Sequence, residues 1–313
     1  MIGVVGLNYW GPNLARNFAG LGALSWICDL DEQRLAAASA RHPGARATSS
    51  YDELLASDVS AVAIATAVPT HYALAKQALE AGKHVFVEKP PAMHANEIDE
   101  LVSLAADRDL VLMPGHLLLY HPGVRKLKEL IDHGELGDVL CVYGNRQNLG
   151  IVRENENALW SLGVHDLSVI LYLLDEDPEL ATAQGSWSIH KGVQDVVFCF
   201  LRFPSGKIAH MHLSWLDPHK MRKMTVVGRE KMVVFDDMEP ERKVTVYEKK
   251  VGSNGEAVSG DIFVPKVSSA EPLRLECEFF LDLLDGKHDK TKVARDGARV
   301  VRALEMLTNS LNG

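Results

Sequence analysis

Short apolar runs alternate with helix-like segments through the first 115 residues, and this alternation constrains the fold more than any other feature of the sequence. The runs are almost entirely apolar, and they lie at residues 2–5, 24–28, 61–65, 84–87 and 110–113. Strands of this kind are buried on both faces, which is typical of a parallel sheet covered by helices on each side. The pattern predicts an α/β fold that begins with a doubly wound domain at residues 1–118.

The pattern changes after residue 120. Residues 122–133 have helical periodicity, a strand is expected at 139–148 and a helix at 157–174, and residues 183–264 then read as successive strands. Pro204-Ser205-Gly206 separates two of these strands in the manner of a hairpin turn. We therefore expect a second, α+β domain at residues 119–313 with a mainly antiparallel sheet.

The last quarter of the chain carries three further expectations. Residues 249–260 are predicted to form a loop. Helices are predicted at 271–284 and 292–310. The final helix, extended to residue 311, is a candidate to pack back on the first domain.

Composition excludes several classes of partner. Among 313 residues, 42 acidic side chains outnumber 33 basic ones, which argues against nucleic acid as a partner because phosphates are bound by clustered Lys and Arg. The four cysteines are widely spaced and form no CxxC pair, which indicates free thiols in a reducing cytoplasm. No apolar run approaches the ~18 residues of a membrane span, and no signal peptide is visible.

The first strand-to-helix turn resembles a dinucleotide-binding loop. It reads Gly6-Leu7-Asn8-Tyr9-Trp10-Gly11. In the G-x-G-x-x-G pattern, Gly6 would form the tight turn and Gly11 would let the helix start close to the strand. Asn8 replaces the middle glycine, and asparagine tolerates positive φ better than other non-glycine residues. An ordinary turn between a strand and a helix is the alternative.

An acidic residue stands where such a loop requires one. Asp29 follows the second strand and lies 23 residues after Gly6. A carboxylate about 20 residues beyond the loop binds ribose hydroxyls and repels a 2′-phosphate, so NAD is favoured over NADP. Asp31 competes for this role, although its position favours capping of the next helix.

Two charged residues follow the strand at 84–87. In a parallel sheet the carboxyl end of a strand faces the ligand crevice, so Glu88 and Lys89 are expected beside the cofactor. A surface ion pair is the alternative. On the predicted helix 157–174, Ser161 and His165 lie four residues apart and share a face. His165 is suited to proton transfer near neutral pH, although a packing role is more usual for a helical histidine.

These residues together resemble the Gfo/Idh/MocA oxidoreductases, the relatives of glucose–fructose oxidoreductase and inositol dehydrogenase. The resemblance extends over essentially the whole chain. It is carried by Gly6–Gly11, Asp29, Thr66 with Pro69 and His71, Glu88-Lys89-Pro90, Gly115-His116, and Trp160 to Asp166. It implies an NAD(P)-dependent oxidation of a secondary hydroxyl on a sugar, polyol or sugar nucleotide. It also implies an open-faced second sheet that is used for subunit contact, as in a homodimer or homotetramer.

The resemblance also implies residue roles. Lys89 matches the lysine beside the nicotinamide, and His165 matches the histidine that acts as general acid and base. Glu88, Thr66 and His71 match positions that contact the cofactor. Ser161 stands where the family usually has an aspartate, so one stabiliser of a cationic Lys89 or His165 is missing.

Substrate contacts are predicted around the strand at 139–148. Arg146 and Asn148 share one face of that strand by period two and are expected to project into the cleft, with a solvated strand end as the alternative. Tyr120 and Ser161 are further candidate neighbours of the substrate. His210 and His212 share a strand face but lack a third ligand in the pattern, so no metal site is predicted.

The sequence therefore predicts a cytoplasmic NAD-dependent dehydrogenase, with NADP less favoured. Two alternatives remain open at this point. One is an NAD-binding protein with little catalysis, which Ser161 motivates. The other is glycoside cleavage with tightly held NAD⁺.

Overall fold

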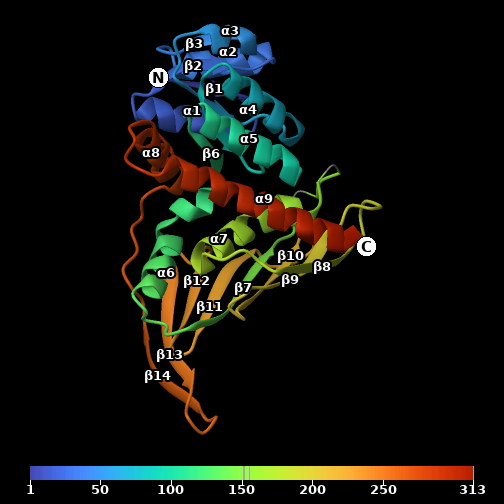
Figure 1. Ribbon diagram of the computed structural model, residues 1–313, viewed down its shortest axis with the longest axis vertical. Coiled ribbons are helices and arrows are strands. Elements are labelled where there is room, and N and C mark those ends of the chain that lie inside the picture. Colours follow the sequence, from blue (N-terminus) through green and yellow to red (C-terminus); the bar gives the residue numbers. More distant parts are fainter. Residues whose placement is uncertain (151, 155, 313) are drawn as a thin grey trace. The chain divides into compact units, whose positions relative to one another are not determined.

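The computed structural model describes residues 1–150, 152–154 and 156–312, and the chain divides into two compact units (Figure 1). The N-terminal unit contains residues 1–117 and 271–302, and the second unit contains residues 118–270 and continues from 303. The expected second domain ran without interruption from 119 to 313. Residues 271–302 belong instead with the N-terminal sheet, because their apolar side chains pack on it.

The N-terminal unit is built on a six-stranded sheet with the order β3-β2-β1-β4-β5-β6, and all neighbouring strands are parallel. The strands are β1 (Ile2–Val5), β2 (Leu24–Cys28), β3 (Arg46–Thr48), β4 (Ala61–Ile64), β5 (His84–Glu88) and β6 (Leu112–Gly115). Its helices are α1 (Gly11–Gly20), α2 (Glu32–Arg41), α3 (Tyr51–Ala56), α4 (His71–Glu80), α5 (Ala95–Asp107), α8 (Pro272–Leu284) and α9 (Lys290–Asn312), the last of which continues into the second unit. The predicted doubly wound sheet is confirmed.

Alternation along β5 shows how the two faces of this sheet are buried. Val85 and Val87 point into a core that also contains Ile98 of α5 and Ala298 of α9. Phe86 points the opposite way, where its ring meets Phe18 of α1 and Phe280 of α8 edge to face. A strand that is apolar on both sides therefore reflects helices on both sides.

The second unit is built on an eight-stranded sheet with the order β14-β13-β12-β11-β7-β10-β9-β8. Only the pair β7 and β10 is parallel among the described pairs, so the prediction of a mainly antiparallel sheet is confirmed. The strands are β7 (Val139–Gln147), β8 (Leu180–Ser186), β9 (Val196–Arg202), β10 (Ile208–Ser214), β11 (Met221–Gly228), β12 (Met232–Asp236), β13 (Val244–Val251) and β14 (Ala257–Phe263). The predicted loop at 249–260 was wrong, because residues 249–251 pair with residues 257–259 across the hairpin of β13 and β14.

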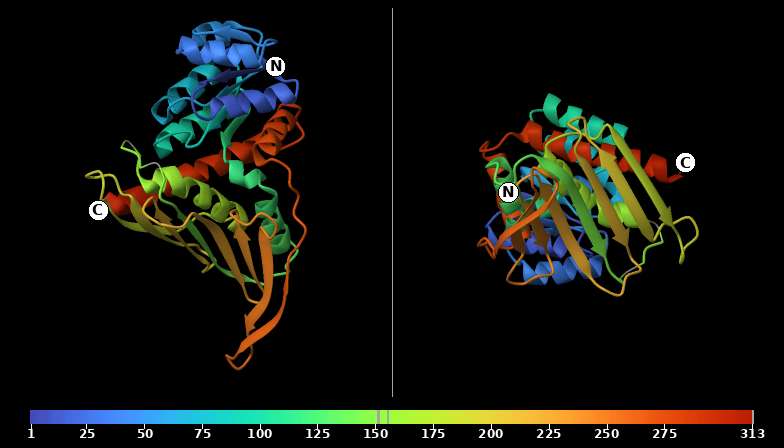
Figure 2. Two further views of the ribbon diagram at one scale, coloured as in Figure 1. Left: turned by 180° about the vertical axis from the view of Figure 1, so that it is seen from behind. Right: turned by 90° about the horizontal axis from the view of Figure 1, so that it is seen from below.

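Helices cover one face of this sheet, as both views in Figure 2 show. They are α6 (Pro122–Asp132) and α7 (Val164–Leu174), and a π-helical turn at Leu159–Gly163 leads directly into α7. The single helix predicted at 157–174 is thus divided into two segments. On the opposite face, Phe198 and Phe200 of β9 are exposed to 54% and 38%.

Candidate functional site

The turn between β1 and α1 has the backbone geometry that the glycine pattern predicts. Gly6 adopts φ +86°, and a Cβ there would lie 2.8 Å from the carbonyl oxygen of Ala65. A Cβ on Gly11 would lie 1.7 Å from the carbonyl oxygen of Gly6, a distance that no side chain tolerates. Both positions therefore require glycine. Asn8 and Tyr9 are exposed and Trp10 is half-buried at the start of α1, so the loop surface is open to a ligand.

Asp29 is held against this turn at the end of β2. One carboxylate oxygen, Oδ2, accepts the N–H of Leu7 at 2.5 Å, and the other, Oδ1, accepts the N–H of Asp31 at 2.8 Å. Asp31 itself accepts the N–H groups of Gln33 and Arg34 and caps α2, as predicted. The structure thus separates the two acidic candidates, with Asp29 at the loop and Asp31 at the helix cap.

His71 lies beneath the site rather than on its surface. Its side chain is 1% exposed, and its ring nitrogens lie 2.8 Å from the carbonyl oxygen of Pro90 and 3.1 Å from that of Thr66. Burial lowers the pKa of His71. The expected direct contact of this ring with the cofactor is not available to a buried side chain. His71 instead joins the half-buried Thr66 at the end of β4 to the turn after β5.

That turn presents Glu88 and Lys89 at the carboxyl end of β5. Both side chains are half-buried, Glu88 Oε2 accepts the N–H of Lys89 at 3.2 Å, and the peptide bond between Lys89 and Pro90 is cis. Burial raises the pKa of Glu88 to about 7, although Lys89 and a hydrogen bond from the Trp10 side chain oppose the rise. A carboxyl with such a pKa gains and loses its proton near neutral pH. A carboxylate in an ordinary surface ion pair would stay ionised there, so this environment favours a functional site over that alternative.

Two further ionisable side chains are buried in the same unit. His116, after β6, is 4% exposed, and burial with the nearby charge of Lys89 lowers its pKa to about 4. Glu276 of α8 is 1% exposed. No role was assigned to Glu276 from sequence. The signal was present, because Glu276 lies in an apolar stripe at helical spacing with Leu273, Phe280 and Leu283.

The predicted acid–base residues belong to the second unit. Ser161 lies in the π-helical turn and is 7% exposed, and its N–H donates to the carbonyl oxygen of Asn157. His165 is the second residue of α7 and is half-buried. The cofactor-side candidates lie together around the ends of β1, β2, β4 and β5, whereas Ser161 and His165 lie on their own helical segment.

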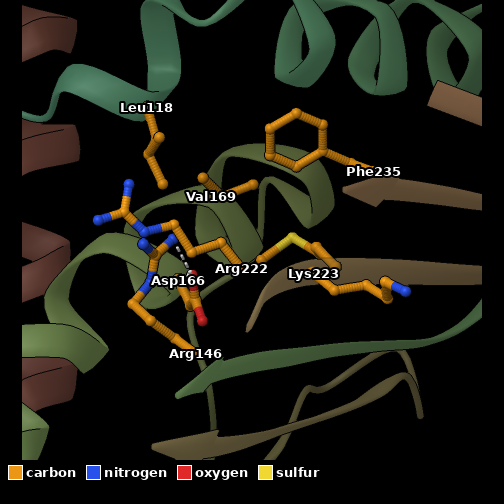
Figure 3. Close-up of a pocket in the computed structure, with 8 residues that line it drawn as sticks. Leu118, Arg146, Asp166, Val169, Arg222, Lys223 and Phe235 are labelled. Carbon is orange, nitrogen blue, oxygen red and sulfur yellow. Dashed lines mark hydrogen bonds and ion pairs between the residues drawn. The ribbon is translucent and has the colours of Figure 1, made fainter. Parts of the chain in front are cut away.

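Arg146 departs from the expectation that it projects freely toward a ligand. It is 8% exposed, and its Nε and Nη2 donate to Asp166 Oδ1, at 2.9 Å and 2.6 Å (Figure 3). The arginine faces the covered side of β7, where Gly144 leaves room for the carboxylate. The adjacent cavity measures about 10 Å³, near the minimum for one water molecule, so it is no substrate pocket.

The other two substrate candidates differ in accessibility. Asn148 is half-buried just after β7, and its N–H donates to the carbonyl oxygen of Ser214. Tyr120 is 7% exposed, and the guanidinium of Arg125 lies 5.2 Å from its ring centroid. Of the two, Asn148 therefore has the more accessible side chain.

The described residues form neither a metal-binding cluster nor a membrane-spanning helix. No group of three or more His, Cys, Asp or Glu side chains there is arranged to hold a metal ion. None of the helices in the described part of the chain has both the length and the apolar character needed to cross a bilayer.

Comparisons with known proteins agree on one family. Residues 1–116 match the family described as "Oxidoreductase family, NAD-binding Rossmann fold", and residues 124–234 match the "GFO/IDH/MocA C-terminal domain". The chain is 28% identical over 237 residues to UDP-N-acetylglucosamine 3-dehydrogenase of Acidithiobacillus ferrooxidans, covering 75% of this chain and 73% of the relative. It is 32% identical over 232 residues to inositol 2-dehydrogenase 2 of Paenarthrobacter aurescens, covering 68% of each chain.

A solved structure is similar to this chain over nearly its whole length. GenD2 from gentamicin A biosynthesis, in complex with NAD, matches with a TM-score of 0.84 and 26% identity. The match covers 99% of this chain and 93% of that one.

Proposed function

Because this chain belongs to the GFO/IDH/MocA oxidoreductases, we propose that it transfers a hydride between NAD and a secondary hydroxyl or ketone of a sugar, polyol or sugar nucleotide. The observation that carries the proposal is the grouping of Asp29, Glu88 and Lys89 with the glycine turn at one end of a parallel sheet. Relatives named for UDP-N-acetylglucosamine and inositol support the substrate class.

We propose NAD rather than NADP as the cofactor. The glycine turn offers backbone N–H groups at the start of α1, and such helix starts bind a pyrophosphate. Asp29 supports the preference, because its carboxylate is fixed beside the turn and would repel a 2′-phosphate. The residues present thus fit a dinucleotide, with Thr66 and Glu88 as further contacts.

We propose that His165 is the general base and that Lys89 assists it at the reacting hydroxyl. In the oxidative direction, the substrate O–H bond breaks and its proton passes to His165, while Lys89 polarises the oxygen or relays the proton. Bound NAD⁺ supplies the acceptor for the hydride, which leaves the substrate carbon with both electrons of the C–H bond. The products are a ketone, NADH and one proton held by the protein. Asn148, Ser161 and Tyr120 remain the proposed substrate neighbours.

Turnover by defined variants tests this assignment. NADH formation is followed across a panel of sugars, inositols and nucleotide sugars, with Lys89→Ala and His165→Ala beside the unaltered protein. We expect each variant to lose about 10²–10⁴-fold in kcat and to keep its NAD⁺ affinity. Near-normal turnover in both would reject the roles of these residues. NAD⁺ binding without NADH formation on any substrate would favour a binding protein.

We further propose that the open face of the eight-stranded sheet contacts a second copy of the chain, in a homodimer or homotetramer. Phe198 and Phe200 are exposed there, and the imidazole of His212 stacks on Phe198 with 4.2 Å between ring centroids. Large exposed apolar side chains that adjoin one another are typical of interaction sites.

A cytoplasmic location is supported by the four cysteines, all of which are free thiols.

A further inference from the structure

A carboxyl group with no assigned role is buried in the N-terminal unit. Glu276 of α8 is 1% exposed, and neither of its carboxyl oxygens has a hydrogen-bond partner within the described residues. An ionised carboxylate in such a place loses its hydration and gains nothing in return. A glutamate kept under these conditions needs an explanation.

The packing of α8 on β5 places this carboxyl beside Glu88. Phe280, one turn after Glu276, packs edge to face on Phe86 with 5.7 Å between ring centroids. Four helix residues advance about 6 Å and two strand residues advance about 6.6 Å, so Glu276 lies alongside Glu88 just as Phe280 lies alongside Phe86. The electrostatic interaction between the two carboxyl groups agrees with this placement.

The Glu88 carboxyl is enclosed by several elements of the unit. The Trp10 side chain at the start of α1 donates a hydrogen bond to it, and the Glu88 Cδ lies only 3.3 Å from where a Cβ on Gly115 would stand. Lys89 is the adjoining cation, and His116 lies near Lys89. Cys277, the next residue on α8, is close enough to both carboxyl groups that burial and their proximity raise the pKa of its thiol.

Two buried carboxyl groups at close range do not both ionise, because each negative charge disfavours the other. Burial, and then the charge of Glu88, raise the pKa of Glu276 well above its ordinary value. Glu88 has the opposing help of Lys89 and Trp10, which Glu276 lacks. The single negative charge of the pair therefore resides on Glu88.

We propose that Glu276 is a positioning residue that stays a neutral acid and, by keeping water away from Glu88, sets the pH at which the cofactor end of the site becomes negatively charged. The proposal rests on the proposed function only in treating Glu88 as a cofactor contact. It assigns no proton-transfer step to Glu276 itself.

The first test uses the protein without cofactor. Native Glu276 holds a proton that the unfolded chain releases above pH ~4.3, so the unaltered protein loses stability as pH rises. Relative to Glu276→Gln, its melting temperature should fall by roughly 2–4 °C for each pH unit above about 5, for as long as native Glu276 keeps its proton. Glu278→Gln is the matched control, because Glu278 lies on the same helix, partly exposed and paired with Arg274. It should show no such slope.

The second test reads the site through NAD⁺ affinity, measured by calorimetry between pH 5.5 and 9. In the unaltered protein, NAD⁺ affinity should change with a midpoint near pH 7, where Glu88 ionises, and Glu88→Gln should abolish this change. Glu276→Gln should keep the midpoint, because an amide fills the same space without charge. Glu276→Ala should move the midpoint down by about one pH unit or more, because water then reaches Glu88. A residue that served folding alone would lower stability in Glu276→Ala and leave the midpoint in place.

Two results would overturn the proposal. One is a melting-temperature difference between the unaltered protein and Glu276→Gln that does not change with pH. The other is an unmoved midpoint in Glu276→Ala. If Glu276→Gln does not fold, infrared spectroscopy of Glu88→Gln at pH 8 replaces it, and the absence of a protonated carboxyl band contradicts a neutral Glu276. If the unaltered protein does not bind NAD⁺ at any pH, the proposed function is rejected instead. The first test, which uses no cofactor, still decides the role of Glu276.

Discussion

The guanidinium of Arg146 and the carboxylate of Asp166 form an ion pair under the covered face of the eight-stranded sheet. Their side chains are only 10% and 4% exposed, and two N–H groups of the arginine donate to the same oxygen. An arginine with its donors committed in this way fixes α7 to β7. Because Asp166 adjoins His165, the pair also fixes the backbone from which His165 projects.

Removing one partner of this pair should be costly. Arg146→Ala leaves Asp166 charged and buried, and we expect a loss of about 3–5 kcal/mol in the free energy of unfolding. The double variant Arg146→Met with Asp166→Leu should recover most of that loss, because no charge remains unpaired. Urea denaturation followed by circular dichroism measures both. A stable Arg146→Ala protein with a raised KM would instead return Arg146 to the substrate site.

The glycine turn gives a second prediction. Gly11→Ala places a methyl group against the carbonyl of Gly6, so the turn must open, with an expected loss of about 1–3 kcal/mol in stability. NAD⁺ affinity should fall more than about tenfold, because a shift of the turn moves its N–H groups. Gly44→Ala is the control, since a Cβ there meets nothing within 4 Å. Equal NAD⁺ affinities for the two variants would exclude the turn as the pyrophosphate site.

His116 should make the N-terminal unit sensitive to acid. Its pKa is about 4 in the folded protein and about 6.5 when unfolded, so the unfolded chain binds more protons between these values. Stability should therefore be unaffected by this group at pH 7 and should fall as pH drops from 6.5 to 4, by up to about 3 kcal/mol. His116→Gln should remove that part of the loss in acid denaturation curves. An unchanged acid profile in the variant would show that folding does not lower the pKa of His116.

Ser161 gives a prediction about rate. A carboxylate four residues before His165 favours the cationic imidazole that forms when the histidine takes a proton. Ser161→Asp should therefore raise kcat for NADH formation at alkaline pH and move the low-pH limit of that activity upward, because His165 must be neutral to accept the proton, while NAD⁺ affinity stays constant. Ser161→Asn, which has nearly the same shape and no charge, should not. A lower kcat in Ser161→Asp than in Ser161→Asn would mean that the serine itself is required.

The exposed sheet face gives a prediction about assembly. Phe198→Asp and Phe200→Asp place charges where a second copy is proposed to pack, and both should lower the molecular mass measured by light scattering. Leu30→Asp changes an even more exposed apolar residue in the other unit and should leave the mass unchanged. If the Phe variants keep their mass, the copies associate through another surface.

The sequence was most informative where one periodicity determines a structure. Fully apolar strands and the glycine turn predicted the parallel sheet and the loop geometry, because few folds bury such strands and no other residue fits at Gly11. Side-chain partners were harder to predict. The alternation of residues along β7 put Arg146 and Asn148 on one face of the strand. It did not show that α7 covers this face and that Asp166 binds the arginine there.

Long-range packing explains the other differences. The division of the chain at 118 did not reveal that Phe280 completes the core beside Phe86, because that contact joins residues almost 200 positions apart. The role of His71 as a bridge was hidden for a different reason, because the sequence does not show which backbone carbonyl groups a buried ring meets. Charged turn residues at 249–260 masked strands that pair only with each other and with β12.

The N-terminal unit is discontinuous in the chain, since it needs residues 271–302. A ribosome therefore releases the six parallel strands long before it makes the helix that covers Phe86. During this interval the face of β5 that α8 will cover is exposed to water, while residues 118–270 of the second unit are made. The nascent protein completes the core of its first unit late, and the segment that begins at Glu271 determines when this happens.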